Sequence, residues 1–240
     1  MTHVRQCYNR VTNYLPERYS HSEDAMLKNV FGRRDDENRA KSEGRLPPGQ
    51  SLTNRFPVLH YGPVPRTDLS KWTLRVFGDV EEEVTWTWEQ FMQLPRTQVT
   101  LDLHCVTRWS KFDTAWEGVS LKTLIDEKFI KPKPSAKFVI QHCEYNYTTN
   151  APLSVLLQDN FLLATHYDGK PIDLEHGWPL RGVLGAIPSQ RTDGDLYLWK
   201  GGKWLRGLEF SAVDKPGFWE QAGYSNEANV WKEQRFSYGW

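Results

Sequence analysis

The chain has 240 residues, with 30 Lys and Arg against 30 Asp and Glu, so its formal net charge is zero. Its 39% hydrophobic and 25% charged residues are typical of a globular protein with one large domain or two small ones. The balanced charge excludes the broad basic surface of a general nucleic-acid binder, and no apolar run is long enough to span a bilayer. Three cysteines (Cys7, Cys105 and Cys143) and a start without an apolar signal segment indicate a cytoplasmic protein.

The first 45 residues are predicted to form a charged arm. Residues 17–45 carry many charges of both signs and few apolar side chains, so they cannot bury enough surface to offset the entropy of ordering. A helical part is expected around Asp24–Phe31. Residues 46–215 are then expected to form the folded body, and residues 216–240 an aromatic tail that packs on it.

Alternating apolar residues predict strands over Trp72–Val80, Val84–Trp88 and Val99–His104. Thr87 with Gln90 resembles a capping box that opens a helix through Leu94, and Ser120 is expected to cap a helix through Phe129. Further elements are expected in order along the chain: a strand at Phe138–Cys143, a helical turn at Leu153–Gln158, and strands at Phe161–Tyr167, Leu196–Trp199 and Leu205–Phe210. Strands mixed with short helices in no regular βαβ order predict the α+β class.

Three motifs could carry chemistry, and each also has a purely structural interpretation. Cys105 ends an apolar strand and is followed by Arg108, whose charge would favour a thiolate, although a buried cysteine also serves as a small hydrophobe. His176 and Arg181 could converge on one anion or could belong to a surface turn. Gly201, Gly202 and Lys203 could form an anion-binding nest or an ordinary turn.

The dipeptide His-Cys occurs twice, at His104–Cys105 and at His142–Cys143, each time at the end of an apolar strand. Two His and two Cys could form a tetrahedral zinc site if those strand ends were neighbours. Successive residues on a strand point to opposite faces, so all four side chains could converge only where the strands end. A zinc-binding domain is therefore one alternative function.

Five stretches, in this order, resemble the molybdopterin-binding domain of the sulfite oxidase superfamily: RLPPGQSLTNRFPVLHYGPVP, LDLHCVTRWSKFDTAWEGVSL, HCEYNYTTNAPL, LLATHYDGKPIDLEHGWPLR and WKGGKWLRGLEF. Within it, the chain is similar to the small cytosolic bacterial sulfite oxidase-like oxidoreductases, relatives of the catalytic subunit of methionine sulfoxide reductase. The resemblance implies a mixed-sheet α+β fold that holds a molybdenum cofactor. The chain after Phe210 is too short for the family's C-terminal Ig-like dimerisation domain, so that domain is expected to be absent.

The resemblance also implies a role for each matching residue. Cys105 matches the cysteine that binds molybdenum, and Arg108 becomes a candidate anchor for an anionic substrate. The remaining matches are to cofactor-binding positions, with Cys143 beside the pterin rather than on the metal: Asn54, Pro57, Val58, Cys143, His176, Arg181, Gly201, Gly202 and Lys203. Residues 185–195 look like an insertion relative to close relatives, and Gly201–Gly202 replaces Ser-Ala, so the cradle could be looser here.

The predicted activity is transfer of an oxygen atom to or from a sulfur-type substrate, of the sulfite or sulfoxide class, while molybdenum cycles between Mo(VI) and Mo(IV). The implied partners are a small oxyanion or sulfoxide substrate and an unidentified electron-transfer partner. A molybdopterin-binding module with little activity is a second alternative, beside the zinc-binding domain.

Overall fold

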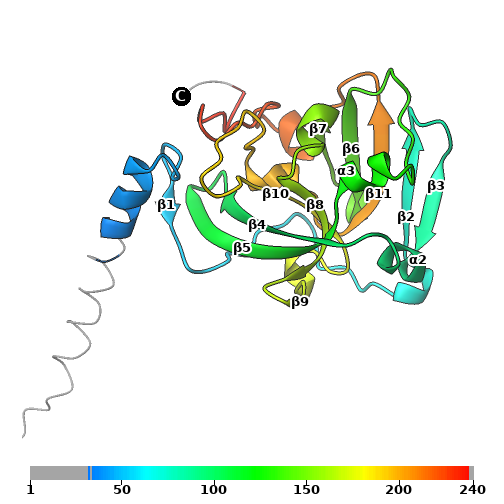
Figure 1. The fold of residues 1–240 in the computed structure, drawn as a ribbon, viewed down its shortest axis with the longest axis horizontal. Helices are drawn as coiled ribbons and strands as arrows, with labels where there is room; N and C mark the ends of the chain where they lie inside the picture. Colours follow the sequence, from blue (N-terminus) through cyan, green and yellow to red (C-terminus); the bar gives the residue numbers. More distant parts are fainter. Residues whose placement is uncertain (1–31, 33, 238–240) are drawn as a thin grey trace, which may run out of the picture.

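Two mixed β-sheets form the body of the protein (Figure 1). The computed structural model describes residue 32 and residues 34–237. A six-stranded sheet has the order β1-β5-β8-β10, with β4 also paired to β5 and β9 to β8, and a five-stranded sheet has the order β3-β2-β11-β6-β7. Strands of the first sheet are β1 Ser51–Leu52, β4 Thr97–His104, β5 Trp109–Val119, β8 Phe161–Tyr167, β9 Lys170–Pro171 and β10 Arg181–Leu184. Strands of the second are β2 Thr73–Gly78, β3 Val84–Thr87, β6 Phe138–Cys143, β7 Thr148–Pro152 and β11 Leu205–Ser211.

The long strand β5 organises the first sheet. It pairs antiparallel with β4 and with β8, and its first residues pair parallel with β1 at Ser51↔Trp109. The short turn between β4 and β5 contains Cys105. This turn therefore lies beside the entry of the chain into the body at β1.

The larger apolar core combines side chains of the second sheet and the short helices with residues of the first sheet. Trp72, Phe91 and Phe161 are among its largest fully buried side chains. The α-helices are short: α2 Trp88–Met92, α3 Leu121–Asp126, α4 Leu153–Leu156 and α5 Phe218–Gln221. Single 3₁₀ turns are η1 Leu69–Lys71, η2 Glu144–Asn146, η3 Leu174–His176 and η4 Leu198–Lys200. The α+β prediction is confirmed.

Both predicted helix starts are confirmed. Thr87 and Gln90 form a reciprocal capping box, and the Ser120 side chain accepts a hydrogen bond from the backbone of Thr123. The predicted helix ends at Leu94 and Phe129 are wrong, because α2 and α3 stop earlier. The strand expected over Leu196–Trp199 is wrong as well, because the chain there forms the 3₁₀ turn η4.

The ends of the described chain also contact the body. Residues 34–42 are helical, and Arg45 forms ion pairs with the carboxylates of Asp102 and Asp113. The predicted helix around Asp24–Phe31 lies outside the described residues, and the division of the chain at residues 45 and 215 stays a prediction. Among the described residues, no helix is both long and apolar enough to cross a membrane.

Candidate active site

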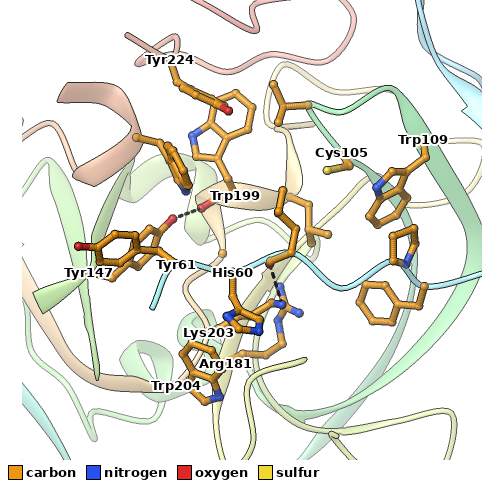
Figure 2. A pocket seen from close by; sticks show the side chains of 17 residues that line it. His60, Tyr61, Cys105, Trp109, Tyr147, Arg181, Trp199, Lys203, Trp204 and Tyr224 are labelled. Carbon is orange, nitrogen blue, oxygen red and sulfur yellow. Dashed lines mark hydrogen bonds between the residues drawn. The ribbon is translucent and has the colours of Figure 1, made fainter. Parts of the chain in front are cut away.

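An aromatic-walled pocket lies where the turn after β4, the start of β10 and the C-terminal segment meet (Figure 2). Its volume, including the part that is open to solvent, is about 820 Å³. Figure 2 shows Cys105 and Trp109 on one side of the pocket and Tyr147 and Tyr61 on the other. The pocket thus joins one thiol to a set of rings from distant parts of the chain.

Cys105 is the thiol of this pocket and is 8% exposed. Its backbone N–H donates to the carbonyl of Trp109 at 2.9 Å, which closes the turn that leads into β5. The hydroxyl of Thr107 donates to the sulfur at 3.1 Å and so orients it. A thiol held at the pocket wall by its own turn is suited to bind a metal, as predicted for Cys105.

Arg181 and Lys203 place two cations in the same pocket. The guanidinium of Arg181 is 1% exposed and donates to the carbonyls of His176 and Gly182, and burial lowers its pKa to about 10. The ammonium of Lys203 donates to the carbonyls of Leu59 and Glu175, and burial, followed by the charge of Arg181, lowers its pKa to about 7. Neither cation has an ion pair with a described carboxylate, so the pocket is arranged to receive an anion.

The two glycines before Lys203 serve close packing. A Cβ on Gly201 would lie 2.4 Å from the carbonyl oxygen of Gly182, and a Cβ on Gly202 would lie 2.4 Å from the sulfur of Cys143. The N–H of Gly202 donates to the Gln141 side chain at 2.9 Å. Gly201 lines the pocket, whereas Gly202 and Cys143 do not, and burial raises the pKa of the Cys143 thiol. The Gly-Gly pair thus lets the turn pack against β10 and Cys143.

His176 lies just behind the pocket. Its ring stacks on the ring of Phe56, which lines the pocket, with centroids 3.9 Å apart and an interplanar angle of 12°. The Nδ1 atom is buried without a hydrogen-bond partner. Burial, followed by the charges of Lys203 and Arg181, lowers the pKa of His176 to about 4, so the ring is neutral at physiological pH.

The remaining predicted residues divide between pocket and surface. Pro57 lines the pocket, but the exposed Asn54 and Val58 do not. Arg108 also lies outside the lining: it is exposed and has a positive φ of 72°. Its Nη1 atom lies near Gly49, 3.0 Å from the position that a Cβ on that glycine would take, and the role of Arg108 as a substrate anchor stays a prediction.

Most of the aromatic wall was not predicted from the sequence. The rings that line the pocket are Phe56, Tyr61, Trp109, Tyr147, Trp199, Trp204, Trp219 and Tyr224. Tyr224 packs against Trp199 and Trp219 at centroid distances of 5.3 and 5.1 Å, and its hydroxyl has no hydrogen-bond partner among the described residues. Burial, followed by the charge of Cys105, raises the pKa of this hydroxyl, so it remains a proton donor. A fixed ring with a free hydroxyl is suited to hold a substrate oxygen.

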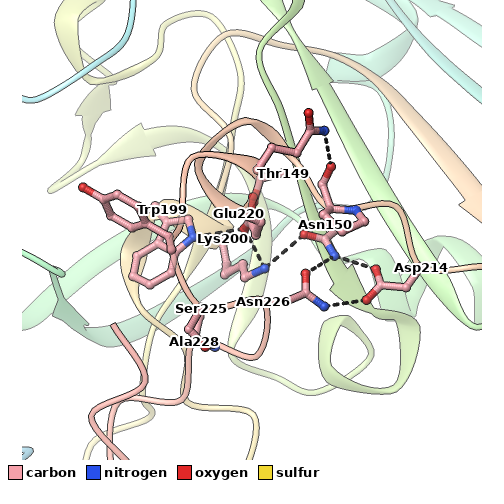
Figure 3. Close-up of polar contacts among 12 residues, drawn as sticks. Thr149, Asn150, Trp199, Lys200, Asp214, Glu220, Ser225, Asn226 and Ala228 are labelled. Carbon is pink, nitrogen blue, oxygen red and sulfur yellow. Dashed lines mark hydrogen bonds and ion pairs between the residues drawn. The ribbon is translucent and has the colours of Figure 1, made fainter. Parts of the chain in front are cut away.

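A buried ion pair holds the C-terminal segment against this wall (Figure 3). The Lys200 ammonium lies 2.6 Å from the Glu220 carboxylate, and the two side chains are 0% and 1% exposed. Glu220 also accepts a hydrogen bond from the indole N–H of Trp199 at 3.0 Å, and Lys200 donates to Asn150 at 3.0 Å. Lys200 thus anchors α5 and the indole of Trp199 rather than contacting a ligand.

The two His-Cys pairs do not converge. His142 contacts the carboxylate of Glu209 at 2.9 Å, while Cys143 belongs to the buried apolar cluster of the second sheet. His104 is buried in the first sheet against the Ser110 hydroxyl. In the described part of the chain, no group of three or more His, Cys, Asp and Glu residues could hold a metal ion. The zinc alternative is therefore wrong for these residues.

Comparison with known proteins identifies the class. A family model described as an oxidoreductase molybdopterin binding domain matches residues 61–219, and the chain belongs to this family. It is 40% identical over 201 residues to an uncharacterized oxidoreductase, YuiH, of Bacillus subtilis (strain 168), covering 83% of this chain and 96% of that protein. It is 27% identical over 182 residues to a putative protein-methionine-sulfoxide reductase subunit, YedZ1, of Azospira oryzae, covering 74% of this chain and 64% of that protein. Its fold is similar to that of the sulfane dehydrogenase SoxCD from Paracoccus pantotrophus, with a TM-score of 0.53, 20% identity, and coverage of 65% of this chain and 42% of that one.

The residues of the pocket fit the cofactor of this family. Arg181 and Lys203 form an unpaired cationic site of the kind that a pterin phosphate would neutralise. Cys105 is the one thiol among the described lining residues, and a soft sulfur ligand suits a metal already bound by dithiolene sulfurs. The buried Nδ1 of His176 has no hydrogen-bond partner, and such an orphaned polar atom beside the pocket fits a residue that bonds to a bound group.

Proposed function

We propose that this molybdopterin oxidoreductase of the sulfite oxidase family transfers an oxygen atom between its metal centre and a sulfur compound. The observation that carries the proposal is the meeting of one thiol, two unpaired cations and an aromatic wall in a single pocket. Bound molybdopterin supplies the two-electron molybdenum couple and the exchangeable oxygen. Cys105 would bind the metal, with Thr107 orienting the sulfur, while Arg181 and Lys203 hold the phosphate.

The pocket favours a neutral organic sulfoxide over an oxyanion as substrate. Once a phosphate engages Arg181 and Lys203, the lining contains no other lysine or arginine, and what is left is mainly aromatic. The hydroxyl of Tyr224, which lines the pocket, would donate to a sulfoxide oxygen, and the rings would bury an apolar substituent. A sulfite dianion would instead enter without a matching charge, which costs desolvation energy.

Steady-state kinetics on the molybdenum-loaded protein test this function. We expect reduction of an aryl methyl sulfoxide at roughly tenfold or higher kcat/KM than dimethyl sulfoxide, because burying an additional ring is worth about 1.5–3 kcal/mol. Sulfite oxidation, followed with an artificial electron acceptor, is expected to be slower than reduction of either sulfoxide. Oxidation of sulfite without reduction of any sulfoxide would refute the substrate assignment.

A Cys105→Ser variant tests the assigned ligand and separates an enzyme from a binding module. We expect it to keep its fold and pterin content but to lose turnover. The matched control is Cys143→Ser, whose thiol is buried away from the pocket, and it should retain turnover. Full activity of the Cys105→Ser variant at wild-type molybdenum content would exclude the role given to Cys105. Absence of turnover in the loaded wild type with every sulfur substrate would favour the binding module.

A further inference from the structure

A second buried guanidinium lies behind the cysteine turn. Arg235, in the C-terminal segment, is only 4% exposed. Its Nη1 donates to the carbonyl of Val106 at 2.8 Å and reaches the carbonyl of Cys105 at 3.5 Å. Its Nη2 reaches the carbonyls of Pro48 and Gly49, each at 3.4 Å. Arg235 therefore connects the turn after β4 with the segment that enters β1.

The carbonyl of Cys105 is held from three directions. It accepts hydrogen bonds from the Gln50 side chain at 3.0 Å, from the backbone N–H of Arg108 at 3.0 Å, and from Arg235. Arg108 has a φ of 72°, a conformation that costs a non-glycine residue about 1 kcal/mol. Contacts from outside the turn are therefore needed to keep this local geometry.

The burial of Arg235 is costly in itself. Its nearest described carboxylate, that of Glu233, lies 3.6 Å away and is 44% exposed, and its Nε has no partner. An apolar side chain could fill the same volume without this desolvation cost. What the guanidinium adds is a set of donors aimed at the backbone that carries the metal-binding thiol.

The same guanidinium is packed against the aromatic wall. It lies 4.8 Å from the ring centroid of Tyr197, which is buried and stacks on Trp199 at 5.3 Å with an interplanar angle of 11°. Trp199 lines the pocket. Arg235 thus fixes the turn that carries Cys105 relative to the opposite wall.

We propose that Arg235 is a positioning residue that fixes the direction of the Cys105 thiolate toward the metal by holding the Cys105 and Val106 carbonyls. The proposal rests on the proposed function, because it takes Cys105 as the metal ligand. It predicts that the loss of Arg235 changes the coordination of the metal more than it changes cofactor content.

The test compares Arg235→Met and Arg235→Lys with the control Arg191→Met in holoenzyme. Arg191 also packs on an indole, with its guanidinium 4.6 Å from the Trp231 ring centroid, but it is not among the described side chains that donate to the cysteine turn. For Arg235→Met we expect an altered electron paramagnetic resonance spectrum of the half-reduced metal, kcat lower by roughly tenfold to a hundredfold, and KM within about twofold. Arg235→Lys keeps the charge and one donor nitrogen, so its spectrum and kcat should lie between those of the wild type and Arg235→Met. Arg191→Met should match the wild type.

Hydrogen exchange on cofactor-free protein provides a readout independent of activity. The Arg108 amide, which donates to the Cys105 carbonyl, should exchange faster in Arg235→Met, while amides of the second sheet keep their protection. If Arg235→Met does not fold, two other variants take its place: Arg235→Lys, and Gln50→Leu, which removes another donor to the Cys105 carbonyl. Both must then alter the spectrum. Spectra of the folded variants identical to the wild type would overturn the proposal. Absence of oxygen transfer in the wild type would refute the proposed function alone, because spectra and exchange still test Arg235.

Discussion

The buried pair of Lys200 and Glu220 gives the sharpest stability prediction. We consider Glu220→Gln, which keeps the volume of the side chain and removes its charge. The substitution leaves the Lys200 ammonium, 0% exposed, with neutral acceptors only, the Asn150 oxygen and the new amide oxygen at position 220. Breaking a buried pair in this way costs about 3–5 kcal/mol. Burial already lowers the pKa of Lys200, so part of the cost will be met by deprotonation and the lower end is expected.

Thermal and urea unfolding measure this loss. For a chain of this size each kcal/mol shifts Tm by about 2–4 °C, so a loss of about 3 kcal/mol in Glu220→Gln should lower Tm by roughly 6–12 °C. The matched control is Asp126→Asn, which breaks the exposed helical pair with Lys122 at 2.9 Å. Such a pair is worth about 0.3–0.5 kcal/mol, so the control should change Tm by about 2 °C at most.

The location of the pair adds a second readout. Trp199 donates to Glu220, so loosening of α5 should also change the fluorescence of the pocket tryptophans. Equal Tm values for Glu220→Gln and Asp126→Asn would refute the reasoning, because they would show that the Lys200 charge is not confined to the interior.

Three further predictions concern the pocket. Arg181→Met should lower the pterin content of purified protein several-fold without a loss of fold, and unchanged pterin content would contradict the phosphate site. The pKa of His176 is depressed to about 4 in the folded protein, compared with about 6.5 in the unfolded chain. The neutral ring therefore contributes fully to the free energy of unfolding above about pH 6.5, and this contribution is lost as the pH falls. At pH 4.5 the loss is about 2.5 kcal/mol. In urea unfolding of cofactor-free protein, the free energy of unfolding should therefore fall more steeply with decreasing pH for the wild type than for His176→Gln. If it falls equally in both proteins, the buried ring is not neutral in the fold. Gly202→Ala should cost about 1–3 kcal/mol through its clash with the Cys143 sulfur, and Cys143→Ala should recover most of that loss; additive effects would rule out the contact.

Local patterns in the sequence predicted local structure well. The strands Phe138–Cys143 and Phe161–Tyr167 have the predicted bounds, because each begins with a short apolar run, which is typical of a strand buried on both faces. The segment Leu196–Trp199 has a similar pattern but forms a 3₁₀ turn. There the rings of Tyr197 and Trp199 pack against the C-terminal segment, and such distant contacts leave no local signal.

The candidate site was predictable where a motif carries it and not where tertiary packing does. Cys105, Arg181 and Lys203 follow from motifs, and the structure places all three in one pocket. The sequence does not reveal that Arg108 has a left-handed backbone or that it lies outside the pocket lining. The aromatic wall comes from segments as far apart as Phe56 and Tyr224, so no single stretch of sequence could indicate it.

The C-terminal segment has a consequence for how the enzyme is assembled. A nascent chain that has been synthesised only through β11 already contains Cys105 and both cations of the proposed phosphate site, Arg181 and Lys203. It still lacks the rings of Trp219 and Tyr224 and the guanidinium behind the cysteine turn. The half-made polypeptide would present an open, hydrated groove with a loosely directed thiol. The pterin is therefore expected to enter most readily before Trp219 and Tyr224 pack, and these two rings then complete the wall over a cofactor already in place.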